Sequence, residues 1–183
     1  MTPRALFTGV AILTATLVAA AAGNDETISV RETDGAYVVT AHFSVPEPAA
    51  VVRNVLTDYE SIPRFMPDVR LSRVLDRGEG YVRVEQEAVS KFMMLSRTVH
   101  LVLDVTQESE TIRFRDRCGR SFRHYEGSWI VAEHGDRTDV DYELTATPAF
   151  SVPGFVLRRL LDRDARVMIE RLRTEIGARA ATR

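Results

Sequence analysis

The sequence is poor in cysteine: Cys118 is the only one in 183 residues. A single cysteine cannot form a disulfide within the chain, so packing rather than covalent cross-links must hold the fold together. Because Cys118 stands beside Gly119, it is predicted to be a small loop residue, and pairing with a second molecule is the alternative. Its position far down the chain also argues against a lipid-modified cysteine next to an N-terminal cleavage site.

A large excess of charge of one sign is missing as well. The chain has 24 Lys and Arg against 26 Asp and Glu, for a formal net charge of −2. Nucleic-acid-binding domains carry a clustered basic surface, so the composition does not favour nucleic acid as a partner. Internal repeats and Pro/Gly/Ser-rich linkers are also missing after Gly23, which predicts a single domain over residues 23–183.

Recognisable catalytic and metal-binding patterns are absent from the sequence too. Ser128 lacks the Gly-x-Ser-x-Gly pattern of a nucleophile elbow. Asp58 and Glu60 stand at a predicted helix end, where acidic residues generally cap helices. The histidines stand singly, without the spacing of zinc ligands; they are His42, His100, His124 and His134. We therefore predict no catalytic residue, no metal site and no cofactor.

The first 22 residues form a distinct segment. They hold one charge, Arg4, followed by an apolar and small-residue run that ends in four alanines. This order is typical of a cleavable signal peptide, whereas a membrane-spanning helix needs about 20 strongly apolar residues; a permanent anchor is the alternative. We predict a signal peptide at 1–22, a periplasmic or secreted location, and a mature domain at 23–183 whose formal charge, without Arg4, is −3.

Periodicity divides the remaining chain into strands and helices. Asp34 and Gly35 separate two alternating segments and indicate a tight hairpin turn. Strands are predicted at 28–33, 36–45, 69–76, 81–90, 95–108, 111–117, 122–134 and 138–147, and helices at 49–57, 59–65 and 153 to about 177. Pro48 suits the first turn of the first helix.

The last predicted helix has two kinds of face. Its apolar stripe consists of Leu157, Leu161, Ala165, Met168, Leu172 and Ile176 at spacings of three and four. Its remaining faces carry charged residues, among them Arg158, Arg159, Asp164 and Arg173. We predict that these charges face solvent, and docking on anionic lipid is the alternative.

Strand alternation indicates which side chains face inward. Gln86 shares its parity with Val84, and Tyr142 shares its parity with Leu144. A buried polar group needs a hydrogen-bond partner. Gln86 is therefore predicted either to contact a ligand or to bond neighbouring backbone. Tyr142 is predicted either to contact a ligand or to fill the core with its hydroxyl at the rim.

Glycine, aromatic and methionine residues complete the set of candidates. Gly127 is predicted to bend its strand, and Trp129 to fill the core or a cavity wall. Aromatic residues and methionines beside turns suit the entrance of a hydrophobic pocket, or else they pack the small helices and the terminal helix onto the sheet edge. These residues are Phe65, Met66, Met93, Met94, Phe150 and Phe155.

Four segments carry a family resemblance. They are FSVPEPAAVVRNVLTDYESIPRFMP (43–67), SRVL (72–75), FRHYEGSWIV (122–131) and TATPAFSVPGFVLRRLL (145–161). They resemble the polyketide cyclase/dehydrase and coenzyme Q-binding branch of the START-like (SRPBCC) superfamily, with VLTDYE and GSW as the most specific elements. The resemblance implies an α+β helix-grip fold. In this fold a curved antiparallel sheet wraps around a long C-terminal helix, two short helices follow the first main strand, and a cavity lies between sheet and helix.

The combined features predict a non-catalytic protein that binds an isoprenoid, quinone or other lipid in that cavity. A cyclase/dehydratase-like enzyme and an interaction module with a closed core are the alternatives, because one fold hosts many functions. The expected partner is a hydrophobic small molecule or lipid, with transient membrane contact, and the chain is expected to be a monomer. The predicted ligand-binding residues are Phe65, Met66, Val84, Gln86, Leu101, Phe114, Trp129, Tyr142, Leu144, Phe155, Leu161 and Met168.

Overall fold

The computed structural model describes residues 26–92 and 95–182. The elements in chain order are β1 (Thr27–Thr33), β2 (Ala36–Val45), α1 (Ala49–Thr57), η1 (Tyr59–Ser61), α2 (Ile62–Phe65), β3 (Val69–Gly78), β4 (Tyr81–Phe92), β5 (Leu95–Gln107), β6 (Thr111–Asp116), β7 (Phe122–His134), β8 (Arg137–Pro148) and α3 (Gly154–Ala181). Every predicted strand and helix is present, and the predicted second short helix divides into η1 and α2. The predicted signal peptide, Met93 and Met94 lie outside the described residues.

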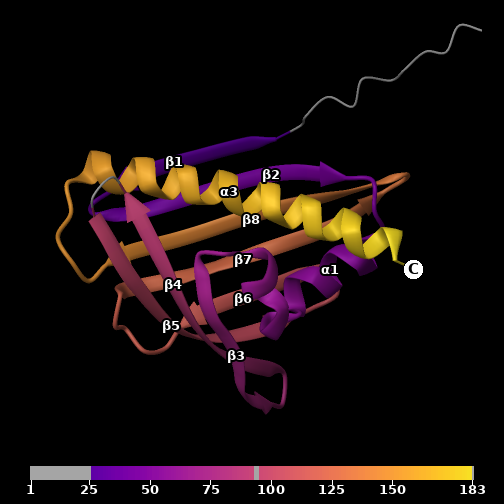
Figure 1. Ribbon diagram of the computed structural model, residues 1–183, viewed down its shortest axis with the longest axis horizontal. Coiled ribbons are helices and arrows are strands. Elements are labelled where there is room, and N and C mark those ends of the chain that lie inside the picture. The colour runs from indigo at the N-terminus through magenta and orange to yellow at the C-terminus, as the bar shows by residue number, and fades with distance from the viewer. Residues whose placement is uncertain (1–25, 93–94, 183) are drawn as a thin grey trace, which may run out of the picture.

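All eight strands belong to one antiparallel sheet (Figure 1), in the order β1-β2-β8-β7-β6-β5-β4-β3. The predicted β1–β2 turn is confirmed: Asp34 and Gly35 have φ angles of 53° and 76°. The left-handed region at these two positions is the conformation that a tight hairpin turn requires. The N-terminal hairpin then joins the last strand, because Tyr37 pairs with Ala146 and Val45 with Thr138.

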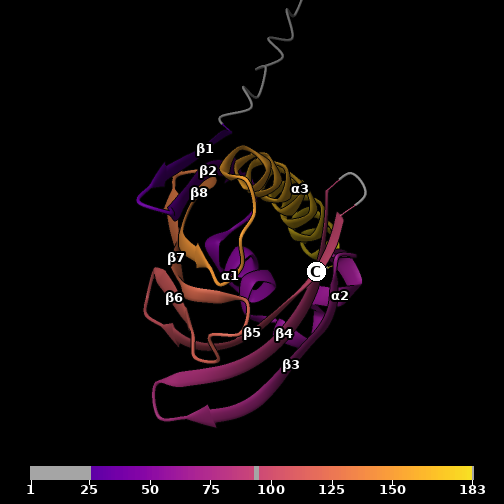
Figure 2. The same ribbon diagram turned by 90° about the vertical axis from the view of Figure 1, so that its left-hand side faces the viewer.

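The sheet curls around one side of α3 (Figure 2), which confirms the helix-grip architecture. The helix packs against β1 and β2 at one edge of the sheet and against β4 near the other edge, and it also contacts α1 and α2. Strand β3 has register shifts between Val69 and Leu71 and between Val74 and Asp76. Such irregularities increase the local twist and bend of a strand.

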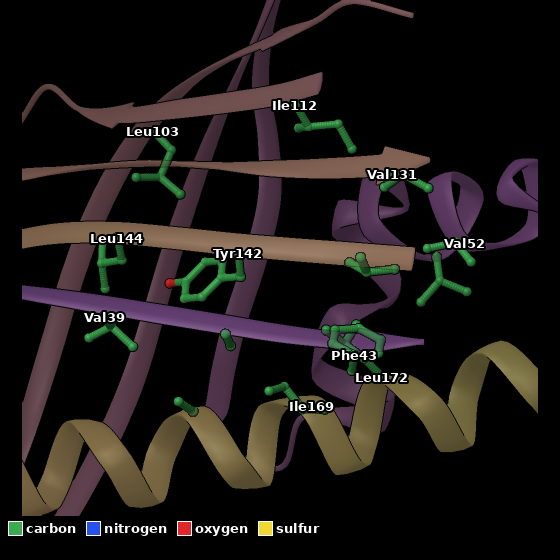
Figure 3. Packing of buried hydrophobic residues seen from close by; sticks show 14 of the residues in the cluster. Val39, Phe43, Val52, Leu103, Ile112, Val131, Tyr142, Leu144, Ile169 and Leu172 are labelled. Atoms are coloured by element: carbon green, nitrogen blue, oxygen red, sulfur yellow. The ribbon is translucent and has the colours of Figure 1, made fainter. Parts of the chain in front are cut away.

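The core lies between α3 and the inward face of β2 and β8. Phe43 of β2 is fully buried and faces Ile169 and Leu172 of α3 (Figure 3). The stripe of α3 differs in part from the predicted one, because Ile169 is fully buried while Leu161 and Met168 are half-buried. Burying one such side chain contributes about 1.5–3 kcal/mol, so this contact is a main attachment of the helix.

Pro48, before α1, occupies a position slightly different from that predicted. The helix begins at Ala49, and Pro48 is its N-cap residue with φ −59° and ψ 146°. The predicted position of Pro48 inside the first turn is therefore wrong by one residue. Thr138 of β8 holds the segment between β2 and α1 in place, because its fully buried hydroxyl donates to the Glu47 carbonyl oxygen at 2.7 Å.

Candidate functional site

Most of the predicted ligand-binding residues gather on the inward face of the sheet and the facing side of α3. Val84, Leu101, Tyr142 and Leu144 are buried members of one apolar cluster. The half-buried members that pack against the cluster include Phe65, Met66, Phe114, Trp129, Leu161 and Met168. Phe155 does not join them: it is 70% exposed at the start of α3.

A row of aromatic side chains runs along this inward face. It consists of Trp129, Tyr142, Phe114, Tyr125, Phe122 and Phe150, and we call it the aromatic row. The ring centroids of Trp129 and Tyr142 lie 4.3 Å apart, and those of Phe122 and Tyr125 lie 4.9 Å apart. Offset and tilted contacts at these distances are the favourable arrangements of aromatic pairs. The row gives the inward face a continuous aromatic surface.

Gly127 makes room for the centre of the row. It pairs with Leu144 on β8 and with Phe114 on β6. A Cβ atom at this position would collide with the Glu143 carbonyl oxygen and would lie 2.6 Å from Phe114 Cζ. The glycine therefore serves the close approach of backbone and ring, one of the two roles expected of a glycine in a strand.

Two tyrosine hydroxyls lie inside this aromatic surface. Tyr125 and Tyr142 interact through their side-chain oxygens. Burial raises the pKa of Tyr125 to about 12 and the pKa of Tyr142 well above its usual value of 10. Both hydroxyls are therefore neutral at pH 7, so they can donate hydrogen bonds but cannot serve as tyrosinate bases.

Gln86 and Ser72 add a second polar point on the inward face. Gln86 Nε2 donates to Ser72 Oγ at 3.2 Å, and Ser72 is 6% exposed. The two residues are paired across β3 and β4. The sequence predicted that Gln86 would contact either a ligand or the neighbouring backbone. Its hydrogen-bond partner is instead a neighbouring side chain.

Asp164 is a carboxylate that the sequence pattern assigned to the solvated side of α3. In the structure it is half-buried and accepts a hydrogen bond from Ser90 Oγ of β4 at 2.8 Å. Burial raises the pKa of Asp164, although the Ser90 hydrogen bond and Arg163 act in the opposite direction. The predicted solvation of this residue is wrong because α3 passes over the end of β4.

Asp58 of the VLTDYE segment has a structural role that differs from the predicted capping. Asp58 makes no side-chain capping hydrogen bond; it accepts one from Arg179 of α3 at 2.9 Å. Tyr59 is buried, and its hydroxyl accepts a hydrogen bond from Gln107 Nε2 at 3.1 Å. The segment therefore ties the small helices to α3 and β5.

The histidines lie apart from the inward face and pair with acidic neighbours. His42 Nδ1 lies 2.8 Å from Asp141 Oδ1, and His100 lies 3.3 Å from Glu87. Within residues 26–92 and 95–182, no three His, Cys, Asp or Glu side chains converge as metal ligands would. Cys118 is a half-buried free thiol whose Sγ lies 3.7 Å from the His100 carbonyl oxygen.

Among the hollows formed by the described residues, two open on the outside of the molecule. The larger is a groove of about 740 Å³ between β1 and the first turns of α3, and Phe155 lines it. The smaller, about 260 Å³, lies over β2, β7 and β8 and is lined by polar residues such as His42 and Ser128. Sequence reasoning identified neither hollow.

Sequence reasoning also missed Tyr125 and Phe122 of the aromatic row. Tyr125 shares the parity of Trp129 along β7, and this signal was available in the sequence. Phe122 does not follow that parity, because the register of β7 and β8 shifts between Phe122 and His124. A shift of this kind is invisible to a period-two pattern.

Solved structures with the same fold include proteins of different activity. One is the protein TTHA0849 from Thermus thermophilus, with 22% identity over 77% of this chain and 97% of the other, and a TM-score of 0.66. Another is the Zhui aromatase/cyclase from Streptomyces sp. R1128, with 17% identity over 79% and 96% and a TM-score of 0.67. A third is a STAR-related lipid transfer protein from Xanthomonas axonopodis, with 17% identity over 83% and 98% and a TM-score of 0.63.

The family relationship comes from the sequence itself. No curated protein matches the chain. The model of the family described as "Polyketide cyclase / dehydrase and lipid transport" matches residues 45–173. This match extends from the end of β2 to the last turns of α3, and it therefore includes the small helices and the aromatic row. The chain belongs to the polyketide cyclase / dehydrase and lipid transport family.

Proposed function

We propose that the protein binds a hydrophobic small molecule, such as an isoprenoid, a quinone or another lipid, between the inward face of the sheet and α3, without turning it over. The observation that carries the proposal is the aromatic row on the inward face. Ligand sites of this kind are mainly apolar and aromatic, with a few polar groups that fix orientation. The Tyr125–Tyr142 pair and the Gln86–Ser72 pair supply such groups.

The distribution of burial on the inward face supports this location. Under α3, the inward residues of β2 are buried, from Tyr37 to Val45. Farther along the sheet, inward residues of β4, β6 and β7 such as Val82, Phe114 and Trp129 are only half-buried. Apolar surface that remains partly uncovered on an inward face is available to a ligand.

The proposal places the protein outside the cytoplasm. It rests on the signal-peptide pattern of residues 1–22, which precede the described residues. Within the described part of the chain, none of the helices has the length and hydropathy to cross a membrane. A periplasmic or secreted location would suit a carrier or sensor of molecules that partition into membranes.

The test is ligand uptake by purified protein. The protein is produced from the full chain in an exporting host, analysed by native mass spectrometry, then delipidated and titrated with fluorescent isoprenoid and quinone analogues. We expect a stoichiometric hydrophobic ligand in the native spectrum and saturable uptake afterwards. A folded, delipidated protein that takes up none of the analogues, and that carried no ligand when purified, would overturn the proposal.

A pair of neighbouring variants locates the binding surface. Trp129→Ala removes a large ring from the inward face and should weaken uptake about tenfold or more, since truncating a buried aromatic anchor costs at least about 1.4 kcal/mol of binding in typical cases. Ile130→Ala alters the next residue, which is 42% exposed on the outward face. It should leave affinity unchanged, and equal effects of the two substitutions would contradict this location.

A cyclase-like enzyme is the second candidate function, favoured by the neutral Tyr125–Tyr142 pair in an apolar setting. Hydroxyls held in such a place can donate to a carbonyl oxygen as charge develops on it. The Tyr125→Phe and Tyr142→Phe variants keep the ring contacts and remove the donors. Repeated turnover of a polyketide-like substrate that these variants abolish would favour the enzyme, whereas stoichiometric binding without turnover favours the carrier.

A further inference from the structure

The groove between β1 and α3 is distinct from the inward face. It is lined on one side by Ile28 to Glu32 of the edge strand β1, and on the other by residues of the first turns of α3, between Gly154 and Asp162. Figure 1 shows the start of α3 beside β1 along this edge. The aromatic row does not line it. The groove therefore has no part in the ligand site proposed above.

The groove carries an excess of uncompensated positive charge. Three arginines line it: Arg31 from β1, and Arg158 and Arg159 from α3. Among residues 26–92 and 95–182, no acidic side chain pairs with any of the three. All three are exposed, so their guanidinium groups are available to an external anion.

The two acidic residues of the groove are already engaged. Asp162 accepts two hydrogen bonds from Arg166, at 3.0 and 3.2 Å. Glu32 interacts with the Tyr37 hydroxyl, and its Oε2 would lie 2.8 Å from a Cβ atom at Gly154, the first residue of α3. A carboxylate there is stabilised by the N-terminal end of the helix. Asp162 is balanced by Arg166, and Glu32 keeps its negative charge because the Tyr37 hydroxyl is neutral, so the three arginines still outnumber the one unbalanced acid.

An apolar side chain lines the same groove as these arginines. Phe155 is 70% exposed, more than Leu75 at 46% or Ile130 at 42%, which are the other large apolar residues exposed in the described part of the chain. An exposed aromatic ring that shares a groove with arginines lacking an acidic partner matches the interfacial region of a bilayer. The ring there enters between headgroups, and guanidinium groups attract and bind phosphates.

We propose that this groove docks the protein on bilayers that contain anionic phospholipid, with Phe155 inserted among the headgroups and Arg31, Arg158 and Arg159 on lipid phosphates. An acidic peptide or protein would satisfy the arginines but would leave the isolated Phe155 without an apolar counterpart. The docking is peripheral and reversible. It does not depend on the ligand proposed above, because the surface lies outside the inward face.

The test is co-sedimentation with vesicles of phosphatidylcholine alone or with about 30 mol% phosphatidylglycerol, chosen as the anionic probe. All variants are made from the full chain in the same exporting host, and intact masses establish that their N-termini are identical. We expect binding to the anionic vesicles that weakens with added salt, since surface attraction falls off within a Debye length. The dependence on salt and on anionic lipid distinguishes binding through the arginines from general hydrophobic adsorption.

Substitutions in the groove should reduce this binding in steps. Each arginine near an anionic surface is expected to contribute about fivefold in affinity, so Arg158→Ala combined with Arg159→Ala should weaken binding about 25-fold. Phe155→Ala should weaken it about tenfold through lost apolar burial. Matched controls are Arg171→Ala, an exposed arginine of α3 outside the groove, and Leu75→Ala, an exposed apolar residue on β3.

Each outcome of these binding measurements either supports or overturns the docking proposal. Loss of binding in the groove variants, with the two controls unchanged and circular dichroism spectra the same, supports the proposal. Failure of the parent protein to bind anionic vesicles, or equal losses in groove and control variants, overturns it. Binding of an acidic peptide with no vesicle binding would assign the arginines to a protein partner and would also overturn it. Ligand uptake is measured on the same variants and should be unchanged, so the two proposals fail independently.

Discussion

Replacing Gly127 with alanine tests the packing at the centre of the inward face. The added methyl group would collide with the Glu143 carbonyl oxygen and would lie 2.6 Å from Phe114 Cζ and 3.1 Å from Leu144 Cα. The ring can turn aside, but the carbonyl belongs to β8, which is paired on both sides by β2 and β7. We therefore expect strand displacement as well as side-chain movement.

The expected loss in the free energy of unfolding follows from the cost of overpacking beside a strand that is held on both sides. Inserting a methyl group into a well-packed site costs about 1–3 kcal/mol, and the rigid backbone contact places Gly127→Ala at the upper end, about 2–3 kcal/mol. For a domain of this size that corresponds to a fall of roughly 5–10 °C in Tm. Urea denaturation followed by circular dichroism gives the free energy of unfolding, with a thermal scan as the second measurement.

Ser128→Ala is the matched control, because Ser128 is the next residue along β7 and faces the smaller outer hollow. It should change stability by less than about 0.5 kcal/mol, as surface substitutions usually do. If Gly127→Ala were as stable as the parent protein within that margin, the close approach of β7, β8 and Phe114 described above would be incorrect. The variant should also weaken ligand uptake, since it displaces Phe114 within the aromatic row.

Two further predictions concern charged groups. Arg179→Ala should lower the free energy of unfolding by about 1 kcal/mol, because Arg179 donates to Glu175, Asn54 and Asp58 and joins the end of α3 to α1. The control Arg166→Ala breaks only an exposed pair within α3 and should cost less than about half as much in the same urea titration. Equal costs of the two substitutions would refute the anchoring role of Arg179. Burial alone would raise the pKa of Asp116, but backbone amides of Val102, Cys118 and Gly119 donate to it and hold the pKa below its usual value. Its contribution to stability is therefore fully present above its unfolded pKa of about 3.9 and is lost as pH falls through the lower folded value. The stability difference between the parent protein and Asp116→Asn should accordingly shrink below about pH 4, and a difference that stays constant down to about pH 2 would contradict this assignment.

The sheet was largely predictable because its signals are local. Alternation along β8 places Tyr142 and Leu144 on one face, and the Asp34-Gly35 turn sets the β1–β2 register. The limits of β2, α1 and β7 agree with those predicted from the sequence. A period of two along β2 and a helical stripe in α1 each coincide with one buried face, and the pattern alone carries that information.

The remaining features depend on how distant elements are placed. Asp164 and Arg173 belong to a charged helix, and helical periodicity assigns both to solvent. Asp164 instead meets Ser90 of β4, and the Arg173 guanidinium lies 5.4 Å from the centroid of the Phe43 ring. Nothing in the neighbouring sequence records where α3 crosses the sheet. The groove beside β1 was missed for the same reason, because β1 and α3 form it together from opposite ends of the domain.

The order of strands in the sheet also governs how the chain can fold as it is made. Strands β3 to β8 follow one another as a simple meander, but β2 finds its second neighbour only in β8. Domains begin to fold while synthesis proceeds from the N-terminus, so the β1–β2 hairpin emerges with the β2 edge unpaired until the last strand is made. Pairings between distant segments are slow to form, and unpaired strand edges are templates for aggregation. A ribosome that stalls before β8 would therefore release a chain whose first hairpin is left open to other chains.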